Sequence, residues 1–312
     1  MSDAASLAPA PSAPKVLRRK GLSEAWFAWA LIAPALLFIG VIVAWPLLET
    51  IRLSFTNASM GGEDYVGLVN YEKMLASSKF YEVVGRTFFW MFLSVGLKMI
   101  LGLAGATLLN AAVPGRGLFR MMVMPPWVIP IAIGCFGWLW LYNGQFGFLS
   151  GMGQRIGILD GPFEFLAYKT SGFYSAVVTD VWVGTPMVSL FFLAAMQGVN
   201  KDLYEAAWVD GASRWYRFRR ITVPQIMPTI VSMALLSAIW TFNSFDIIYI
   251  LTQGGPRGGT TTLIIDTYKT AIGNFKFGEG ATRAVAIVVI LGIFSLAYMA
   301  ILNRVKRHYG VK

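Results

Sequence analysis

The sequence is poor in charged residues and contains a single cysteine and a single histidine. Charged side chains make up 13% of its 312 residues, against 56% hydrophobic residues. Cys135 is the only cysteine and His308 the only histidine, which excludes a disulfide within the chain and a metal site built from these residues. No Gly-Lys dipeptide, G-x-S-x-G or H-E-x-x-H motif occurs. The chain therefore lacks a Walker-type phosphate loop, and we expect no catalytic, cofactor-binding or metal-binding residues of its own.

Long apolar runs, with a mean hydropathy of +0.60, predict an all-α membrane protein. Each run is long enough to cross a hydrocarbon layer of about 30 Å as a helix. The first run is longer than the apolar core of a signal peptide and lacks a small-residue cleavage site, so we expect it to remain as a span. The six predicted transmembrane helices lie at 26–48, 84–113, 119–142, 173–197, 226–251 and 281–302.

The polar segments predict how the chain is organised about the membrane. Residues 1–24 are rich in Ala, Ser and Pro and end in a basic cluster, which predicts a disordered cytoplasmic tail. Residues 25–303 form the predicted transmembrane domain, and 304–312 a short C-terminal tail. Six spans put both termini on one side, and the segments on that side hold more Lys and Arg, so both termini are predicted to be cytoplasmic. Because the basic residues flank apolar runs rather than form a patch, we expect no nucleic-acid partner despite a pI of about 9.7.

A polar island interrupts the apolar runs at about 200–224. Asp202 is a predicted N-cap and Glu205 its capping-box partner, which places a short helix here. Gly211 is expected to turn the chain through a positive φ. A second helix is predicted to lie at the membrane interface before Pro224 restarts the chain into the next run. Its apolar and basic stripes are Trp215, Phe218, Ile221 and Arg214, Arg217, Arg220.

This island resembles the EAA loop of ABC-importer permeases, in its carbohydrate-uptake form. The matching residues are Glu205, Ala206, Ala207, Asp210, Gly211, Ala212, Phe218, Ile221, Pro224 and Pro228. The resemblance continues through most of the chain from Ala33, and the run Leu251-Thr-Gln-Gly-Gly-Pro is similar to the maltose-type first permease. The alternative is an interfacial hairpin that has no partner.

The resemblance implies a type I ABC importer permease fold in a bacterial cytoplasmic (inner) membrane. It implies a second homologous permease subunit, two copies of an ABC ATPase and an extracytoplasmic solute-binding protein as partners. ATP and Mg²⁺ would bind to the ATPase subunits, so no cofactor is expected in this chain. The residues Glu205, Ala206, Ala207, Asp210, Gly211 and Ala212 would couple the permease to the ATPase.

Three ionisable residues, Lys98, Asp180 and Asp246, lie within or at the ends of predicted spans. Each would cost about 3 kcal/mol at a helix centre facing lipid, so we expect them to face the bundle. Trp240, Asn243 and Asp246 recur at i, i+3 and i+6, which could offer a sugar an aromatic surface and polar partners. Alternatively, Trp240 is packing and Asn243 makes an interhelical hydrogen bond.

Lys98 has two interpretations. It is either structural, bonded to helix carbonyls, a polar side chain or an acid such as Asp180, or it faces the pathway and attracts an anionic sugar derivative. The sequence therefore predicts a permease for a sugar or sugar-like solute, and leaves open a polyol, glycerol phosphate or an anionic derivative such as a sulfosugar. Rival classes are an ATP-independent channel or secondary transporter, and an intramembrane hydrolase that uses Asp180 and Asp246.

Overall fold

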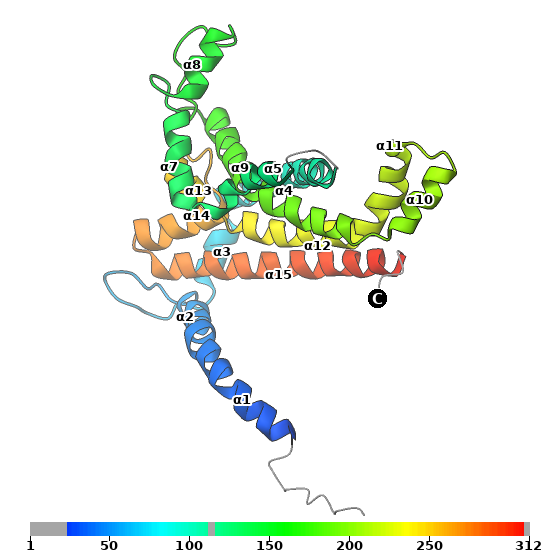
Figure 1. Ribbon diagram of the computed structural model, residues 1–312. Helices are drawn as coiled ribbons and strands as arrows, with labels where there is room; N and C mark the ends of the chain where they lie inside the picture. The colour runs from blue at the N-terminus through cyan, green and yellow to red at the C-terminus, as the bar shows by residue number, and fades with distance from the viewer. Residues whose placement is uncertain (1–23, 112–115, 309–312) are drawn as a thin grey trace, which may run out of the picture. The chain divides into compact units, whose positions relative to one another are not determined.

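The computed structural model describes residues 24–111 and 116–308, and all regular secondary structure in these ranges is helical (Figure 1). The predicted N-terminal tail lies outside the described residues except for Glu24, where the first helix begins. The chain divides into two compact units between Glu49 and Thr50.

The described residues of the first unit are helical and mostly apolar, and the helix ends four residues beyond the boundary of the unit. α1 (Glu24–Ile39) continues through the π-helical segment η1 (Gly40–Ala44) into α2 (Trp45–Leu53). Residues Trp26–Leu53 are long and apolar enough to cross a membrane. The span predicted at 26–48 is therefore present and extends further along the chain.

The second unit contains the remaining helices. They are α3 (Val69–Leu75), α4 (Ser78–Asn110), α5 (Arg116–Val123), α6 (Pro125–Val128), α7 (Ile131–Leu141), α8 (Phe148–Arg155), α9 (Lys169–Gln197), α10 (Lys201–Val209), α11 (Arg214–Arg217), η2 (Phe218–Thr222), α12 (Val223–Phe242), α13 (Asp246–Thr252), α14 (Leu263–Tyr268), η3 (Lys269–Gly273) and α15 (Phe277–His308). α15 continues beyond residue 303, where the sequence predicts the C-terminal tail to begin.

Five helices in the described ranges have the length and composition of membrane spans: Trp26–Leu53, Ser78–Asn110, Lys169–Gln197, Arg214–Phe242 and Phe277–Arg304. The span predicted at 119–142 is not one helix but α5, α6 and α7 in succession. Pro125, Pro126 and Pro130 interrupt it, because proline lacks an N–H and displaces the preceding turn. The span predicted to reach Leu251 ends at Phe242.

The core of the second unit is built on α4, α9 and α12, which pack on one another, and α15 packs along α12 (Figure 1). α4 and α9 approach closely at Gly102, where an added Cβ would lie 2.5 Å from Val188 Cγ1. Small residues permit this contact between membrane helices, where van der Waals packing replaces the hydrophobic effect. α13 packs on α7 and α9, and its Ile247 and Ile248 join a buried cluster with Trp90 and Val177.

The two ends of α12 carry different structures. α10 and α11 lie at the end where the helix begins, whereas α13 and α14 lie near the end where it stops (Figure 1). The second unit thus separates the polar island at 200–224 from the segments that follow Phe242.

Candidate functional site

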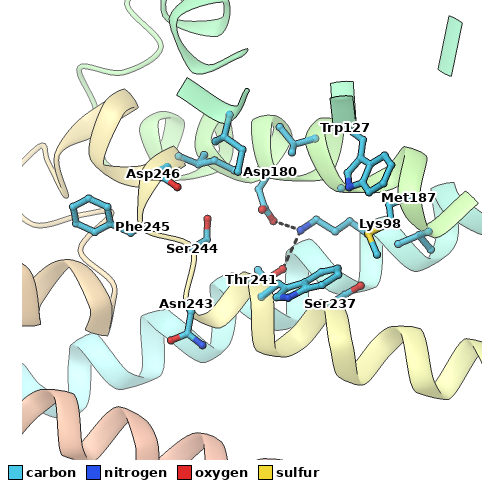
Figure 2. Close-up of a pocket in the computed structure, with 16 residues that line it drawn as sticks. Lys98, Trp127, Asp180, Met187, Ser237, Thr241, Asn243, Ser244, Phe245 and Asp246 are labelled. Atoms are coloured by element: carbon cyan, nitrogen blue, oxygen red, sulfur yellow. Dashed lines mark hydrogen bonds and ion pairs between the residues drawn. The ribbon is translucent and has the colours of Figure 1, made fainter. Parts of the chain in front are cut away.

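A cavity of about 370 Å³ lies where α4, α9 and α12 meet the broken segments α6–α7 and α13 (Figure 2). Both interruptions of the predicted spans border it. The break between α6 and α7 contributes residues on either side, and the link between α12 and α13 contributes three consecutive residues. Its lining includes Trp127, Ile131, Gly184, Met187, Ser237, Thr241, Ser244 and Phe245 together with Lys98, Asp180, Trp240, Asn243 and Asp246.

An ion pair crosses one wall of this cavity. Lys98 Nζ on α4 lies 2.6 Å from Asp180 Oδ2 on α9, and the two side chains are only 7% and 6% exposed. The same ammonium donates to Thr241 Oγ1 on α12 at 2.9 Å (Figure 2). A buried charge needs well-placed partners, because the free-energy cost of removing an ion from water exceeds the energy gained from one weak contact. Lys98 therefore links the three central helices through an acid and a hydroxyl. These contacts are those that the structural interpretation of Lys98 predicts.

Aromatic side chains form much of the remaining wall. Trp240 comes from α12, Trp127 from α6, and Phe245 from the link before α13. Both tryptophans are exposed in this chain rather than packed in the core. A tryptophan has a large apolar face and an N–H that donates a hydrogen bond, so these walls combine flat apolar surfaces with hydrogen-bonding groups.

Asn243 and Asp246 line the cavity, but the helical spacing used to predict them is wrong. α12 ends at Phe242 with Asn243 as its C-cap, and Asp246 begins α13. The Asn243 side chain points away from Lys98 (Figure 2), and its Nδ2 donates to Ile239 O of its own helix at 3.0 Å. The alternative interpretation of Asn243, an interhelical hydrogen bond, is not what this contact shows, because the bond lies within α12. Asp246 lies in the first turn of a helix, where a carboxylate is favoured by the helix dipole.

Sequence reasoning missed Trp127, Gly184 and Thr241. Trp127 enters the cavity because the two prolines before it interrupt the predicted span, and that Pro-Pro pair was the available signal. Thr241 and Gly184 carry no comparable signal in the sequence. Their positions depend on how α12 and α9 cross α4.

The polar island forms a helical hairpin whose first helix begins differently from the prediction. Asn200, not Asp202, is the N-cap of α10: its Oδ1 accepts from the backbone N–H of Asp202 at 3.0 Å. This shift puts Glu205 two positions beyond the N3 site that a capping box requires, so the predicted box is absent. Glu205, Ala206, Asp210 and Gly211 are exposed, and Ala207 and Ala212 are half-buried.

Gly211 turns the chain as predicted, with φ +75°. Its N–H donates to Trp208 O at 3.0 Å, and the N–H of Ala212 donates to Ala207 O at 2.9 Å. This pair of bonds is the Schellman arrangement, in which a left-handed residue closes the end of a helix. Leu203, Trp208 and Val209 of α10 are exposed around this turn, so the hairpin presents an apolar surface with its backbone direction fixed by Gly211.

The second helix of the hairpin is not a separate interfacial helix. Ser213 caps α11, and the helix then continues without interruption from Arg214 to Phe242. Pro224 does not restart the chain, because η2 inserts a wider π turn before it, in which the Val223 N–H donates to Phe218 O. A π turn accommodates a residue that cannot donate the usual hydrogen bond and whose ring would meet the preceding carbonyl.

The family whose description is "Binding-protein-dependent transport system inner membrane component" matches residues 25–309. The Trehalose/maltose transport system permease protein MalF of Thermococcus litoralis is 33% identical over 281 residues, which cover 89% of this chain and 94% of that protein. The Sulfoquinovosyl glycerol transport system permease protein SmoG of Agrobacterium fabrum is 27% identical over 296 residues, covering 93% and 94%.

Solved structures of bacterial ABC transporters share the fold. A chain of a transporter involved in the import of the acidic polysaccharide alginate matches with a TM-score of 0.80 and 20% identity, covering 89% of this chain and 96% of that chain. A second structure of an alginate ABC transporter, in complex with its alginate pentasaccharide-bound periplasmic protein, matches with a TM-score of 0.77 and 21% identity, covering 91% and 94%.

Proposed function

We propose that this chain, which belongs to the family of binding-protein-dependent transport system inner membrane components, carries an uncharged sugar through the membrane as part of an ABC importer. The cavity bordered by Trp127, Trp240 and Phe245 carries the proposal. Sugars have apolar C–H faces as well as hydroxyl groups, so aromatic faces beside hydrogen-bonding groups suit them. The trehalose/maltose permease of Thermococcus litoralis is among the relatives, which supports the same class of cargo.

Broken helices support the proposal that the cavity belongs to the pathway. Within a bilayer, non-helical backbone is tolerated only where it is buried in protein or lines a cavity. The break before Ile131 and the link from Asn243 to Phe245 interrupt helices, and residues of both line this one cavity. Transporters commonly place their substrate sites at such discontinuous helices. Lys98, Asp180, Trp240, Asn243 and Asp246 are therefore the proposed pathway residues.

The charges around the cavity favour an uncharged sugar over an anionic derivative. Of the described lining residues, only Lys98, Asp180 and Asp246 are ionisable, and Lys98 is neutralised by Asp180. An anionic group that took Lys98 as its partner would leave Asp180 buried and unpaired, which costs several kcal/mol. Asp246 would repel the same group. These charges disfavour glycerol phosphate and sulfosugars as the cargo. The role of Lys98 is to neutralise the buried charge of Asp180.

The α10 hairpin is the proposed contact with the ATPase. Its coupling residues Glu205, Ala206, Ala207, Asp210, Gly211 and Ala212 surround the Schellman turn, beside exposed Leu203, Trp208 and Val209. Exposed apolar side chains rimmed by polar ones are typical of a protein interface. Opening and closing of the ATPases would move this hairpin and expose the cavity alternately to the two sides of the membrane.

The complete importer would contain this chain, a second homologous permease, two ATPase subunits and an extracytoplasmic solute-binding protein. ATP and Mg²⁺ bind to the ATPase subunits. Both termini and the α10 hairpin face the cytoplasm of a bacterial cell, in accordance with the excess of basic residues in those segments. α5, α6 and α7 together supply the remaining passage across the membrane.

Reconstitution tests this function. The chain is co-expressed with its proposed second permease and ATPase subunits and is placed in proteoliposomes with ATP inside and the binding protein outside. We expect uptake of trehalose or maltose that requires both components, and a Trp240→Ala variant that assembles but transports at least tenfold more slowly. Uptake without ATP, together with failure to co-purify an ATPase, would establish a channel or secondary transporter instead. Activity that requires Asp180 and Asp246 but not ATP would establish the hydrolase.

A further inference from the structure

A second, smaller cavity lies at the hairpin end of the second unit, with a volume of about 190 Å³. The last turns of α4 and α9 contribute lining residues, and the α10–α11 hairpin and η2 contribute the others. The lining residues are Thr107, Asn110, Met196, Tyr204, Arg214, Arg217, Phe218 and Thr222. The lining thus contains two arginines, three hydroxyl groups, one amide and, among the described residues, no carboxylate.

Arg217 has a buried hydrogen-bond donor that is not used. Its Nε is shielded from solvent and makes no hydrogen bond with any residue in the described ranges. Other partly buried arginines of the second unit are compensated: Arg86 donates to Thr261 O, and Arg283 pairs with Asp266 at 2.8 Å. A guanidinium donor buried without an acceptor costs about 1 to 3 kcal/mol, and more for a charged group. Among the described residues, the cavity beside Arg217 therefore offers this N–H no acceptor, and a bound ligand could supply one.

The groups around the cavity match a phosphate. A guanidinium presents its N–H groups in a fork that fits two phosphate oxygens, and the hydrogen bonds to them are assisted by charge. Arg214, Asn110 and Thr222 border the same space, where Thr222 shares a hydroxyl contact of 2.9 Å with Tyr204. The volume of about 190 Å³ is several times the roughly 30 Å³ that one water molecule occupies in the liquid.

The cavity lies at the ends of helices that have the length and composition of membrane spans. Arg214 is the first residue of the apolar helix that ends at Phe242, and Asn110 is the last residue of α4. Trp215 is 68% exposed beside the cavity, and Tyr216 is also exposed. Tryptophan and tyrosine are enriched at the level of lipid headgroups, and basic residues there attract anionic lipids.

We propose that the cavity around Arg217 binds a phosphate group at the membrane surface, either from the headgroup of an anionic lipid or as free phosphate. Bound there, the phosphate connects the end of α4 to the α10–α11 hairpin and fixes the direction of the hairpin. Its lining shares no residue with the cavity around Trp240, so the proposal does not depend on the cargo proposed above.

Native mass spectrometry of the assembled, delipidated complex tests the site. Phosphatidylglycerol or phosphatidylcholine is added back to the parental complex and to Arg217→Gln and Arg220→Gln variants. Arg220 is the matched control because it is an exposed arginine of the same helix outside the cavity lining. We expect Arg217→Gln to lower the affinity for phosphatidylglycerol at least tenfold, Arg220→Gln to change it less than threefold, and phosphatidylcholine to bind weakly to all three.

Inorganic phosphate distinguishes the two sources. If it binds at millimolar concentration, raises the thermal midpoint of the parental complex only and displaces no lipid, free phosphate is the ligand. If phosphatidylglycerol alone raises the midpoint, the ligand is the lipid. Arg217→Lys keeps the charge but loses the paired N–H donors of the guanidinium, so it should recover less than half of the affinity that Arg217→Gln loses. Equal losses in Arg217→Gln and Arg220→Gln would overturn the proposal, as would unchanged binding in a folded Arg217→Gln complex. Folding is verified by the thermal midpoint in phosphatidylcholine, and transport need not be measured.

Discussion

Lys98 and Gly184 are in direct contact: the lysine side chain lies so close to the backbone of α9 that a Cβ at position 184 would fall 2.7 Å from Lys98 Cε. Only a residue without a side chain leaves space for the lysine here. The contact holds the ammonium against Asp180, at 2.6 Å. Gly184 therefore affects the ion pair by leaving room for the Lys98 side chain, and not through an unusual backbone conformation.

Gly184→Ala should displace Lys98 and lengthen its ion pair with Asp180. Inserting a methyl group against a buried, ion-paired side chain typically costs about 1 to 3 kcal/mol, so we expect a lower thermal midpoint of the purified complex and slower uptake. Gly96→Ala on α4 is the control, because a Cβ there meets no atom within 4 Å. That variant should match the parental protein or exceed its stability slightly, since alanine favours a helix over glycine. Equal effects of the two substitutions would contradict a spatial role for Gly184.

The Lys98–Asp180 pair should show strong coupling in a double-mutant cycle. Lys98→Met and Asp180→Asn each leave one buried group without its partner, and breaking a buried pair in this way costs about 3 to 5 kcal/mol. The double variant removes both charges and should recover most of that loss in a thermal unfolding assay. Lys79→Met is the control: Lys79 is 74% exposed and lies 3.6 Å from Asp266, and Asp266 keeps Arg283 as a partner at 2.8 Å, so this loss should be small.

Additive losses in the cycle would show that the two charges act separately. Uptake then distinguishes the roles of Lys98. A folded double variant that transports an uncharged sugar at the parental rate supports compensation of Asp180. A folded double variant that has lost uptake would mean that the lysine contacts the cargo, as the second sequence-based interpretation holds.

Membrane orientation can be measured with single cysteines in a Cys135→Ser background. Lys201→Cys lies on α10 and Asn274→Cys follows η3, and both positions are exposed. A membrane-impermeant maleimide should label Asn274→Cys in intact cells, and Lys201→Cys only after the cytoplasmic side is opened. Cys135 is the only cysteine of the sequence, so its replacement removes background labelling of this chain. The reverse pattern would exclude both the cytoplasmic location of the hairpin and its contact with an ATPase.

The features predicted best from the sequence are those that a local pattern specifies. The family and the type I fold, identified from the ordered residues between Glu205 and Pro228, are confirmed by the family match and the solved structures. The positive φ of Gly211 is confirmed because a tight turn at the end of a short helix demands it. The need for a partner for Lys98 followed from the cost of burying a charge, and the structure supplies Asp180.

The predictions that failed depend on choices between neighbouring residues. Asn200 and Asp202 are both good N-caps, and the helix begins one residue after the first of them, which removes the capping box for Glu205. Hydropathy does not distinguish a continuous span from a broken one, because proline is tolerated in membrane helices when neighbours satisfy the backbone. The breaks before Ile131 and after Phe242 were therefore missed, and with them the positions of Trp127 and Thr241 in the cavity.

Gly211 offers the sharpest test of the coupling hairpin, because its role depends on backbone conformation alone. Its φ is +75°, and an added Cβ would meet no atom within 4 Å, so a substitution there introduces strain without a steric clash with neighbours. Valine in a left-handed conformation costs roughly 1 to 3 kcal/mol, which is enough to open the Schellman turn and redirect Ala212 and the helix behind it. Gly211→Val should therefore insert and assemble, yet lose sugar uptake and the stimulation of ATP hydrolysis by the loaded binding protein.

Gly211→Asn is the matched control for this substitution, because asparagine adopts the left-handed region far more readily than a β-branched residue. It adds a side chain at the same exposed position, so any effect of bulk against the ATPase should appear in both variants. We expect Gly211→Asn to keep more than half of the parental uptake and of the stimulated ATP hydrolysis, measured in the same proteoliposomes. If valine and asparagine lower both activities equally, the position is sensitive to size, and the left-handed turn does not set the coupling. If valine leaves uptake unchanged, the hairpin does not transmit the movement of the ATPase.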